Sequence, residues 1–310
     1  MKPKGGTEIQ RDQLIAQLDE KDLEGINLFT SICHPDLVKK DKINVLWQQL
    51  SYDQPNVKLM ADRRFVDSVD YFVYNSHWCF EKFRTYFKIP EYKSFVIKNA
   101  THPFDKPAKL GNKTKIIFTS TPWRGLSVLI LAIQHLNKVR DDFEVDVYSS
   151  TQIYGDKFKE ISGDKYDGLY ERCKNTKNMN YLGYAPNEEI RKAVANAHIM
   201  AYPSIFEETS CIAVIEAMMA GCRVVTTNYG ALYETCADFA DMIEYEPNHA
   251  ELAKKFASQL NWVIHNLKEG NYKEDLDLQV KYYEKNYSWK TRIEEWRNFL
   301  QYVRTKEKRA

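Results

Sequence analysis

The sequence lacks the patterns that identify several common classes of protein. It contains no run of eighteen apolar residues, so no membrane-spanning helix is expected. Its six cysteines form no C-x-x-C pair, which favours reduced, buried thiols over a zinc site or a disulfide framework. The seven histidines show no ligand spacing and there is no H-E-x-x-H, so no metal is expected. The G-x-x-x-x-G-K-[ST], G-x-G-x-x-G and G-x-S-x-G patterns are also missing.

An excess of charge of one sign is lacking too. The chain has 44 basic and 43 acidic residues, and both parts are nearly balanced when it is divided at residue 105. Nucleic acid is therefore not expected as a partner. With 44% hydrophobic residues, the 310-residue chain can bury sizeable cores, and its length favours two domains. We expect a cytoplasmic protein. Peripheral contact with the cytoplasmic face of the membrane remains open, as does the oligomeric state.

Apolar runs alternate with amphipathic stretches along the whole chain. This alternation predicts parallel sheets of the doubly wound α/β type. Residues 101–113 hold two prolines and a glycine and are the best candidate for a linker. Strands are expected at 26–31, 42–50, 70–76, 94–100, 114–120, 143–150, 179–184, 198–204 and 222–228, with helices at 7–19, 56–68, 77–87, 125–139, 165–173, 187–196, 210–220, 249–268, 272–285 and 289–307.

The most informative segment is PSIFEETSCIAVIEAMMAG, residues 203–221. It joins an apolar strand to an apolar helix through an acidic turn, with Glu208 in the turn and Glu216 within the helix. We expect Ser210, Cys211 and Ile212 to supply the first helical amides, where phosphate can bind. Glu216 would then lie roughly 9 Å along the helix axis, about the span of a diphosphate with a sugar on each side. The alternative is a capping Glu208 and a solvated Glu216, but a carboxylate among apolar helical residues needs a partner.

This segment resembles the E-x7-E signature of the family 4 retaining glycosyltransferases, P-S-x-x-E-G-F-G-x-x-x-x-E-A-M-A-x-G-x-P-V-V. The chain departs from it with Thr209, Ser210 and Cys211 in place of Gly-Phe-Gly, and with Arg223 in place of proline. The residues that match are Pro203, Ser204, Glu208, Glu216, Ala217, Met218, Ala220, Gly221, Val224 and Val225.

The resemblance implies a GT-B architecture, in which two Rossmann-like doubly wound domains face a cleft. Residues 1–104 would form the acceptor-side domain, residues 105–286 the nucleotide-sugar domain, and residues 287–310 a helix that returns to the first domain. Members usually begin with a strand that leads into a G-G-x-E loop. Here Gly5-Gly6-Thr7-Glu8 follows only MKPK, so the N-terminal domain is expected to lack its first strand. Either the domain is reduced, or the chain begins at an internal methionine of a longer protein.

The resemblance also assigns roles to individual residues. Glu208 would orient the transferred sugar and Arg124 would stabilise the departing diphosphate. Asp53 or Gln49 stands where many members carry a sugar-contacting histidine, and Gly5 and Gly6 would approach the phosphates or the acceptor. The expected donor-binding residues are Glu216 at the ribose, Thr209, Ser210, Cys211 and Ile212 under the phosphates, Gly183 and Tyr184 beside the base, and Gly230 near the sugar.

The predicted function is transfer of a sugar, with retention of configuration, from a nucleoside-diphosphate sugar to a hydroxyl of a glycan, a lipid or another acceptor. No cofactor is expected, and the donor would be linked to UDP or GDP. A nucleotide-sugar epimerase and a phosphorylase of the same fold remain alternatives. A third alternative, from a different class, is a binding or assembly subunit with weak catalysis.

Overall fold

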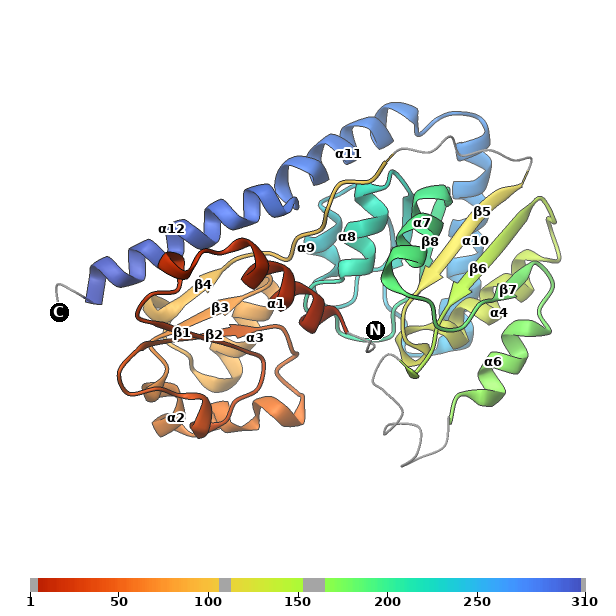
Figure 1. Ribbon diagram of the computed structural model, residues 1–310. Coiled ribbons are helices and arrows are strands. Elements are labelled where there is room, and N and C mark those ends of the chain that lie inside the picture. The colour runs from red at the N-terminus through yellow and green to blue at the C-terminus, as the bar shows by residue number, and fades with distance from the viewer. Residues whose placement is uncertain (1–4, 106–112, 153–164, 308–310) are drawn as a thin grey trace. The chain divides into compact units, whose positions relative to one another are not determined.

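A computed structural model of the protein describes residues 5–105, 113–152 and 165–307. Their contacts group into two compact units. The four-stranded unit comprises residues 6–102, 208–210 and 286 onward, and the six-stranded unit comprises residues 103–207 and 211–285. Both sheets are parallel and both are combined with helices, which confirms the predicted α/β class (Figure 1).

The four-stranded sheet has the order β1-β2-β3-β4. Its strands are β1 (Ile26–Thr30), β2 (Ile43–Gln48), β3 (Tyr71–Tyr74) and β4 (Ser94–Val96). Side chains alternate across the sheet, since Val45 and Trp47 of β2 join one apolar cluster and Leu46 joins the other. The period-2 pattern of β2 therefore places hydrophobic side chains on both faces, as a sheet covered on both sides requires.

Helices cover both faces of this sheet. α1 (Gly6–Gln17) and α12 (Trp289–Glu307) contribute to the cluster that holds Trp47, and the rings of Trp47 and Trp296 meet edge to face at 5.1 Å. α2 (Arg63–Ser68), α3 (His77–Phe87) and the 3-10 turn η3 (Pro55–Ala61) contribute to the cluster that holds Leu46. The C-terminal helix thus completes the core of the four-stranded unit.

The first helix is fixed by a buried amide. Gln10 Nε2 donates to the carbonyl of Ala100 at 2.7 Å, and its Oε1 accepts from the Ala100 N–H at 3.0 Å. Gln10 is 2% exposed, so this pair forms away from water. The helix α1, which begins at Gly6, is consequently held at the chain that follows β4.

The six-stranded sheet has the order β10-β9-β8-β5-β6-β7. The pattern of the sequence predicted five of these strands and missed β10, one of the two edge strands. The strands are β5 (Thr114–Thr119), β6 (Phe143–Tyr148), β7 (Met179–Tyr181), β8 (Ile199–Tyr202), β9 (Arg223–Thr227) and β10 (Asp241–Ile243).

The helices of this unit pack on the sheet and on one another. α10 packs on α4, β9 and β10, while α7 packs on β5 and α8 on β9. Gln279 of α11 joins that helix to the end of α8, donating to the carbonyls of Met218 at 2.8 Å and Cys222 at 3.0 Å. The helices are α4 (Leu126–Leu136), α6 (Asp167–Lys174), α7 (Asn187–Asn196), α8 (Ile212–Met219), α9 (Leu232–Cys236), α10 (His249–Lys268) and α11 (Lys273–Asn286). Across the described ranges, none of the helices has the length and apolar character that crossing a bilayer requires.

Truncation of Trp296 tests the contribution of α12 to the core. Trp296 is fully buried, so Trp296→Ala removes a large apolar side chain and leaves a cavity, which should lower the free energy of unfolding by about 3–5 kcal/mol. Trp262 of α10 is 58% exposed, so Trp262→Ala should change it by less than about 0.5 kcal/mol. Urea unfolding followed by far-ultraviolet circular dichroism measures both. Equal effects of the two substitutions would contradict the packing of α12.

Candidate functional site

The loop between β8 and α8 is held by hydrogen bonds of Ser204. Ser204 Oγ donates to the carbonyl of Phe206 at 3.0 Å and accepts from its N–H at 3.3 Å. The Ser204 carbonyl accepts from Thr227 Oγ1 at 2.8 Å, which ties the loop to the end of β9. Ser204 is completely buried. The loop at the carboxyl end of β8 is therefore an ordered part of the sheet edge.

A second loop, which follows β5, lies directly against this one. Gly125 has φ +128°, and a Cβ built on it would lie 2.1 Å from the carbonyl oxygen of Pro203. Only glycine fits here, because any side chain would overlap the Pro203 carbonyl and would be strained at this φ. The same loop places the Arg124 guanidinium 4.4 Å from the centre of the Phe206 ring. Arg124 thus lies at the carboxyl ends of β5 and β8, where open α/β sheets bind ligands.

The helix that follows the loop begins later than predicted. α8 starts at Ile212, and Cys211 is its N-cap with extended backbone angles. The prediction that the helix begins at residue 210 is therefore wrong by two residues. The amides without an acceptor inside the helix are those of the N-cap Cys211 and of Ile212, Ala213 and Val214. Glu216 is four residues beyond Ile212, which puts it roughly 6 Å along the axis rather than 9 Å.

Glu216 is buried in the body of the helix and paired. Glu216 is 9% exposed, and its neighbours Ile215 and Ala217 are completely buried. Its Oε1 accepts a hydrogen bond from Arg191 Nη1 of α7 at 2.7 Å. The reading of Glu216 as a solvated helical charge is therefore wrong.

The remaining predicted residues of this unit lie on loops at strand ends. Gly183 (φ +68°) follows β7, and Tyr184 beside it is 37% exposed. Gly230 (φ +66°) follows β9, after Tyr229, whose ring stacks on Tyr245 at 4.0 Å and 5°. Each glycine has the positive φ that a tight loop demands and that side chains disfavour.

Residues 208–210 group with the four-stranded unit. Thr209 Oγ1 donates to the carbonyl of Gln49 at 3.1 Å and accepts from Asn75 Nδ2 at 3.1 Å. The amides continue in a chain, with Asn75 Nδ2 also donating to Gln49 Oε1 at 3.1 Å and Gln49 Nε2 to Asn99 Oδ1 at 2.8 Å. Glu208 next to them is 3% exposed. Thr209 therefore binds to amide side chains and backbone at the carboxyl ends of the strands.

This amide chain is neutral and incompletely satisfied. Within the described residues, Asn75 Oδ1, Asn99 Nδ2 and Ser51 Oγ are buried without a hydrogen-bond partner. Such groups are rare in folded proteins and often mark a place for water or a ligand.

Two residues that were predicted to contact the acceptor or the phosphates lie elsewhere in this unit. Asp53 is exposed in the turn after β2, and Gly6 is the first residue of α1.

Sequence reasoning missed Arg191 and the amides Asn75 and Asn99. The sequence did contain a signal for Arg191, because a carboxylate in an apolar helix needs a cation. Arg191 is the arginine of the preceding helix, α7, whose buried residues are Val194 and Ala195. The amides gave no signal, because asparagine after a strand is an ordinary turn residue.

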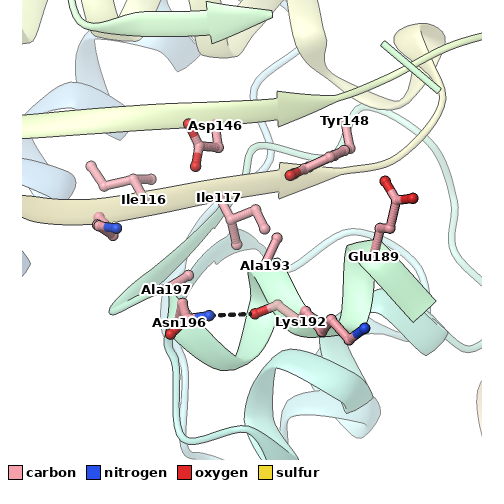
Figure 2. Close-up of a pocket in the computed structure, with 10 residues that line it drawn as sticks. Ile116, Ile117, Asp146, Tyr148, Glu189, Lys192, Ala193, Asn196 and Ala197 are labelled. Atoms are coloured by element: carbon pink, nitrogen blue, oxygen red, sulfur yellow. Dashed lines mark hydrogen bonds between the residues drawn. The ribbon is translucent and has the colours of Figure 1, made fainter. Parts of the chain in front are cut away.

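A separate hollow of about 370 Å³ lies between β5, β6 and α7 (Figure 2). Asp146 and Tyr148 line it from β6 and Glu189 from α7, and burial together with these two carboxylates raises the pKa of Tyr148. None of the predicted donor residues lines it. Its lysines Lys115 and Lys192 are paired with Glu144 and Glu188. The strand ends around Arg124 are therefore the better candidate for the functional site.

Metal ligands are not gathered in the part of the chain that the structure describes. No group of three or more His, Cys, Asp or Glu side chains there has an arrangement that could hold an ion. Arg124 brings positive charge to the β8–α8 loop, because its guanidinium lies over Phe206, and the first amides of α8 add the positive end of the helix dipole.

Comparison with known proteins identifies the family. Residues 104–274 match the model of the family described as glycosyl transferases group 1. No curated protein sequence gives a significant match. This confirms the resemblance at the level of the group 1 family, while membership of family 4 stays a prediction.

Three solved structures of similar fold are distant from this chain in sequence. A glycosyltransferase from Rickettsia africae has 17% identity and a TM-score of 0.69, over 98% of this chain and 83% of that one. HepE of Anabaena, in complex with UDP-glucose, has 16% identity and a TM-score of 0.65, over 83% and 71%. The pneumococcal O-GlcNAc transferase GtfA, with UDP and GlcNAc, has 12% identity and a TM-score of 0.64, over 96% and 60%. These likenesses show the GT-B fold.

Substitution of Gly125 tests the close approach of the two loops. Gly125→Ala should lower the free energy of unfolding by more than about 1 kcal/mol, because the Cβ meets backbone and the φ is positive. Gly168, in α6, has open space around its Cβ position, so Gly168→Ala should stabilise the protein by about 0.5–1 kcal/mol. Thermal unfolding of the two variants measures the contrast, and a neutral Gly125→Ala would refute the contact.

Proposed function

Because the chain belongs to the group 1 glycosyltransferases, we propose that it transfers a hexose from a nucleoside-diphosphate sugar with retention of configuration and without a metal. In this reaction the bond between the anomeric carbon and the diphosphate oxygen breaks, and a bond from that carbon to an acceptor oxygen forms. The hydroxyl proton of the acceptor is released, and the nucleoside diphosphate leaves with its added negative charge. The protein must therefore stabilise a developing diphosphate anion.

The observation that carries the proposal is the contact of Gly125 with Pro203. It brings Arg124 onto Phe206, in the loop that leads into α8. A guanidinium and the amides of Ile212, Ala213 and Val214 then belong to adjoining loops of one sheet edge. Arginine binds phosphate in bidentate fashion, and a helix N-terminus adds positive potential. Together they favour the charge that develops on the leaving group, as an oxyanion hole does.

The two carboxylates have separate roles in this proposal. Glu216, held on α8, would accept hydrogen bonds from the ribose hydroxyls of the donor. Glu208, at the turn, would orient hydroxyls of the transferred sugar. The base would lie by Gly183 and Tyr184, whose loop at the end of β7 is exposed. A uridine or guanosine donor fits the proposal, and HepE and GtfA are seen with UDP-glucose and with UDP.

The acceptor is proposed to be a hydroxyl compound, such as a glycan or a lipid-linked sugar. Support comes from the neutral amides Gln49, Asn75 and Asn99, which end the strands of the four-stranded sheet. Their unsatisfied Oδ1 and Nδ2 atoms offer both an acceptor and a donor, and a hydroxyl can use both.

The proposal predicts a defined loss when Arg124 is changed. Arg124→Met should lower kcat for sugar transfer by about 10²- to 10³-fold, because it removes charge that stabilises the leaving diphosphate. Arg172→Met is the control, since Arg172 is an exposed residue of α6. Release of nucleoside diphosphate from a panel of UDP- and GDP-sugars, with and without acceptor sugars, gives the rate.

The same panel separates the alternatives. An epimerase would convert its donor without an acceptor, a phosphorylase would require phosphate, and a binding subunit would bind nucleotide without turnover. An Arg124→Met variant with the wild-type rate would refute the proposed role of Arg124.

A further inference from the structure

The buried carboxylate of Glu216 is held by a partner from another helix. Arg191 Nη1 donates to Glu216 Oε1 at 2.7 Å, and the side chains of the two residues are 20% and 12% exposed. α7 and α8 pack against each other, and both residues lie in the middle of their helices. A charge-assisted hydrogen bond between two rigid helices fixes where a carboxylate points.

Arg191 is itself fixed on its other side. Its guanidinium carbon lies 3.9 Å from the centre of the Phe104 ring, and its Nη2 donates to the carbonyl of Pro103 at 3.2 Å. Stacking, a backbone acceptor and a carboxylate use different parts of one planar group. Lysine could not reproduce this, because its ammonium is a point charge on a flexible stem.

We propose that Arg191 is the positioning residue that holds Glu216 to read the ribose of the donor, so that the site selects ribonucleotides over deoxyribonucleotides. This inference rests on the proposed function and adds the specificity of one of its residues. Glu216 is a helical glutamate with several rotatable bonds, and a carboxylate free to rotate would lose directional contact with two hydroxyls. With one oxygen bonded to Arg191, the orientation of the carboxylate is set before the donor arrives.

A matched control exists in the same unit. Arg223 is 8% exposed, is ion-paired with Asp241 through its Nε at 2.5 Å, and lies over the Tyr272 ring at 4.2 Å. It begins β9 and Asp241 begins β10, so this pair lies at the amino ends of the strands. Like Arg191 and Glu216, this pair joins a guanidinium to a carboxylate, but it lies away from the carboxyl ends of the strands.

The test compares the dissociation constants of UDP and 2′-deoxy-UDP, and of GDP and 2′-deoxy-GDP, by isothermal titration calorimetry. The wild type should bind the ribonucleotide of the preferred pair about 10- to 100-fold more tightly, as expected of a hydrogen bond to a charged group. Arg191→Met should bring this ratio close to one, and Glu216→Gln should do the same. The double variant Arg191→Met/Glu216→Gln should show a ratio no lower than that of either single variant.

Two further variants separate positioning from stability. Phe104→Leu, which removes the ring under the guanidinium but keeps an apolar side chain, should lower the ratio partly. Arg223→Met should lower the melting temperature and leave the ratio unchanged. If folded Arg191→Met or Phe104→Leu protein keeps the wild-type ratio, or if Arg223→Met loses it, the inference is overturned.

Failure of the proposed function would look different in this experiment. A wild type that binds none of the four nucleotides would refute nucleotide-sugar transfer itself. If the wild type binds a ribonucleotide and its deoxy form equally, the proposed nucleotide-sugar donor still stands. The inference that Glu216 recognises the ribose is then refuted.

Discussion

The backbone contact between Gly125 and Pro203 is the constraint on which the candidate site depends. It joins the loop after β5 to the loop after β8, two neighbouring strands of the six-stranded sheet. Parallel strands end at one edge, so loops that follow them can meet, but a side chain at residue 125 would hold them apart. Because the contact exists, Arg124 lies over Phe206, in the loop that leads into α8, where we propose that it stabilises a departing diphosphate.

The second part of the candidate site is the buried ion pair of Glu216 and Arg191. A carboxylate within an apolar helix is expensive to desolvate, and removal of one partner of such a pair is strongly destabilising. Arg191 offsets this for Glu216, and Phe104 and Pro103 hold Arg191 in turn. The four-stranded unit differs in character. Its strand ends carry neutral amides and a buried Thr209, which suit hydroxyl groups better than phosphates.

The sequence predicts the sheets well and the site in part. Alternating apolar runs place β1 to β9 and the α/β class, because each strand carries its own periodicity. The edge strand β10 has three residues and no such signal. The motif indicates Glu216 and the family resemblance indicates Arg124. The start of α8 was predicted two residues early, since the extended backbone of Cys211 is a matter of local geometry. Arg191 and the amides Asn75 and Asn99 act through contacts between distant segments, which periodicity does not reveal.

The central claim is that a nucleoside diphosphate binds at the carboxyl ends of β5 and β8. A crystal structure of the protein with UDP or GDP tests it most directly. We predict density for the diphosphate at Arg124 and the amides of Ile212 and Ala213, with ribose hydroxyls within hydrogen-bond distance of Glu216. Nucleotide bound instead in the hollow lined by Asp146, Tyr148 and Glu189, or absent from both places at saturating concentration, would contradict it.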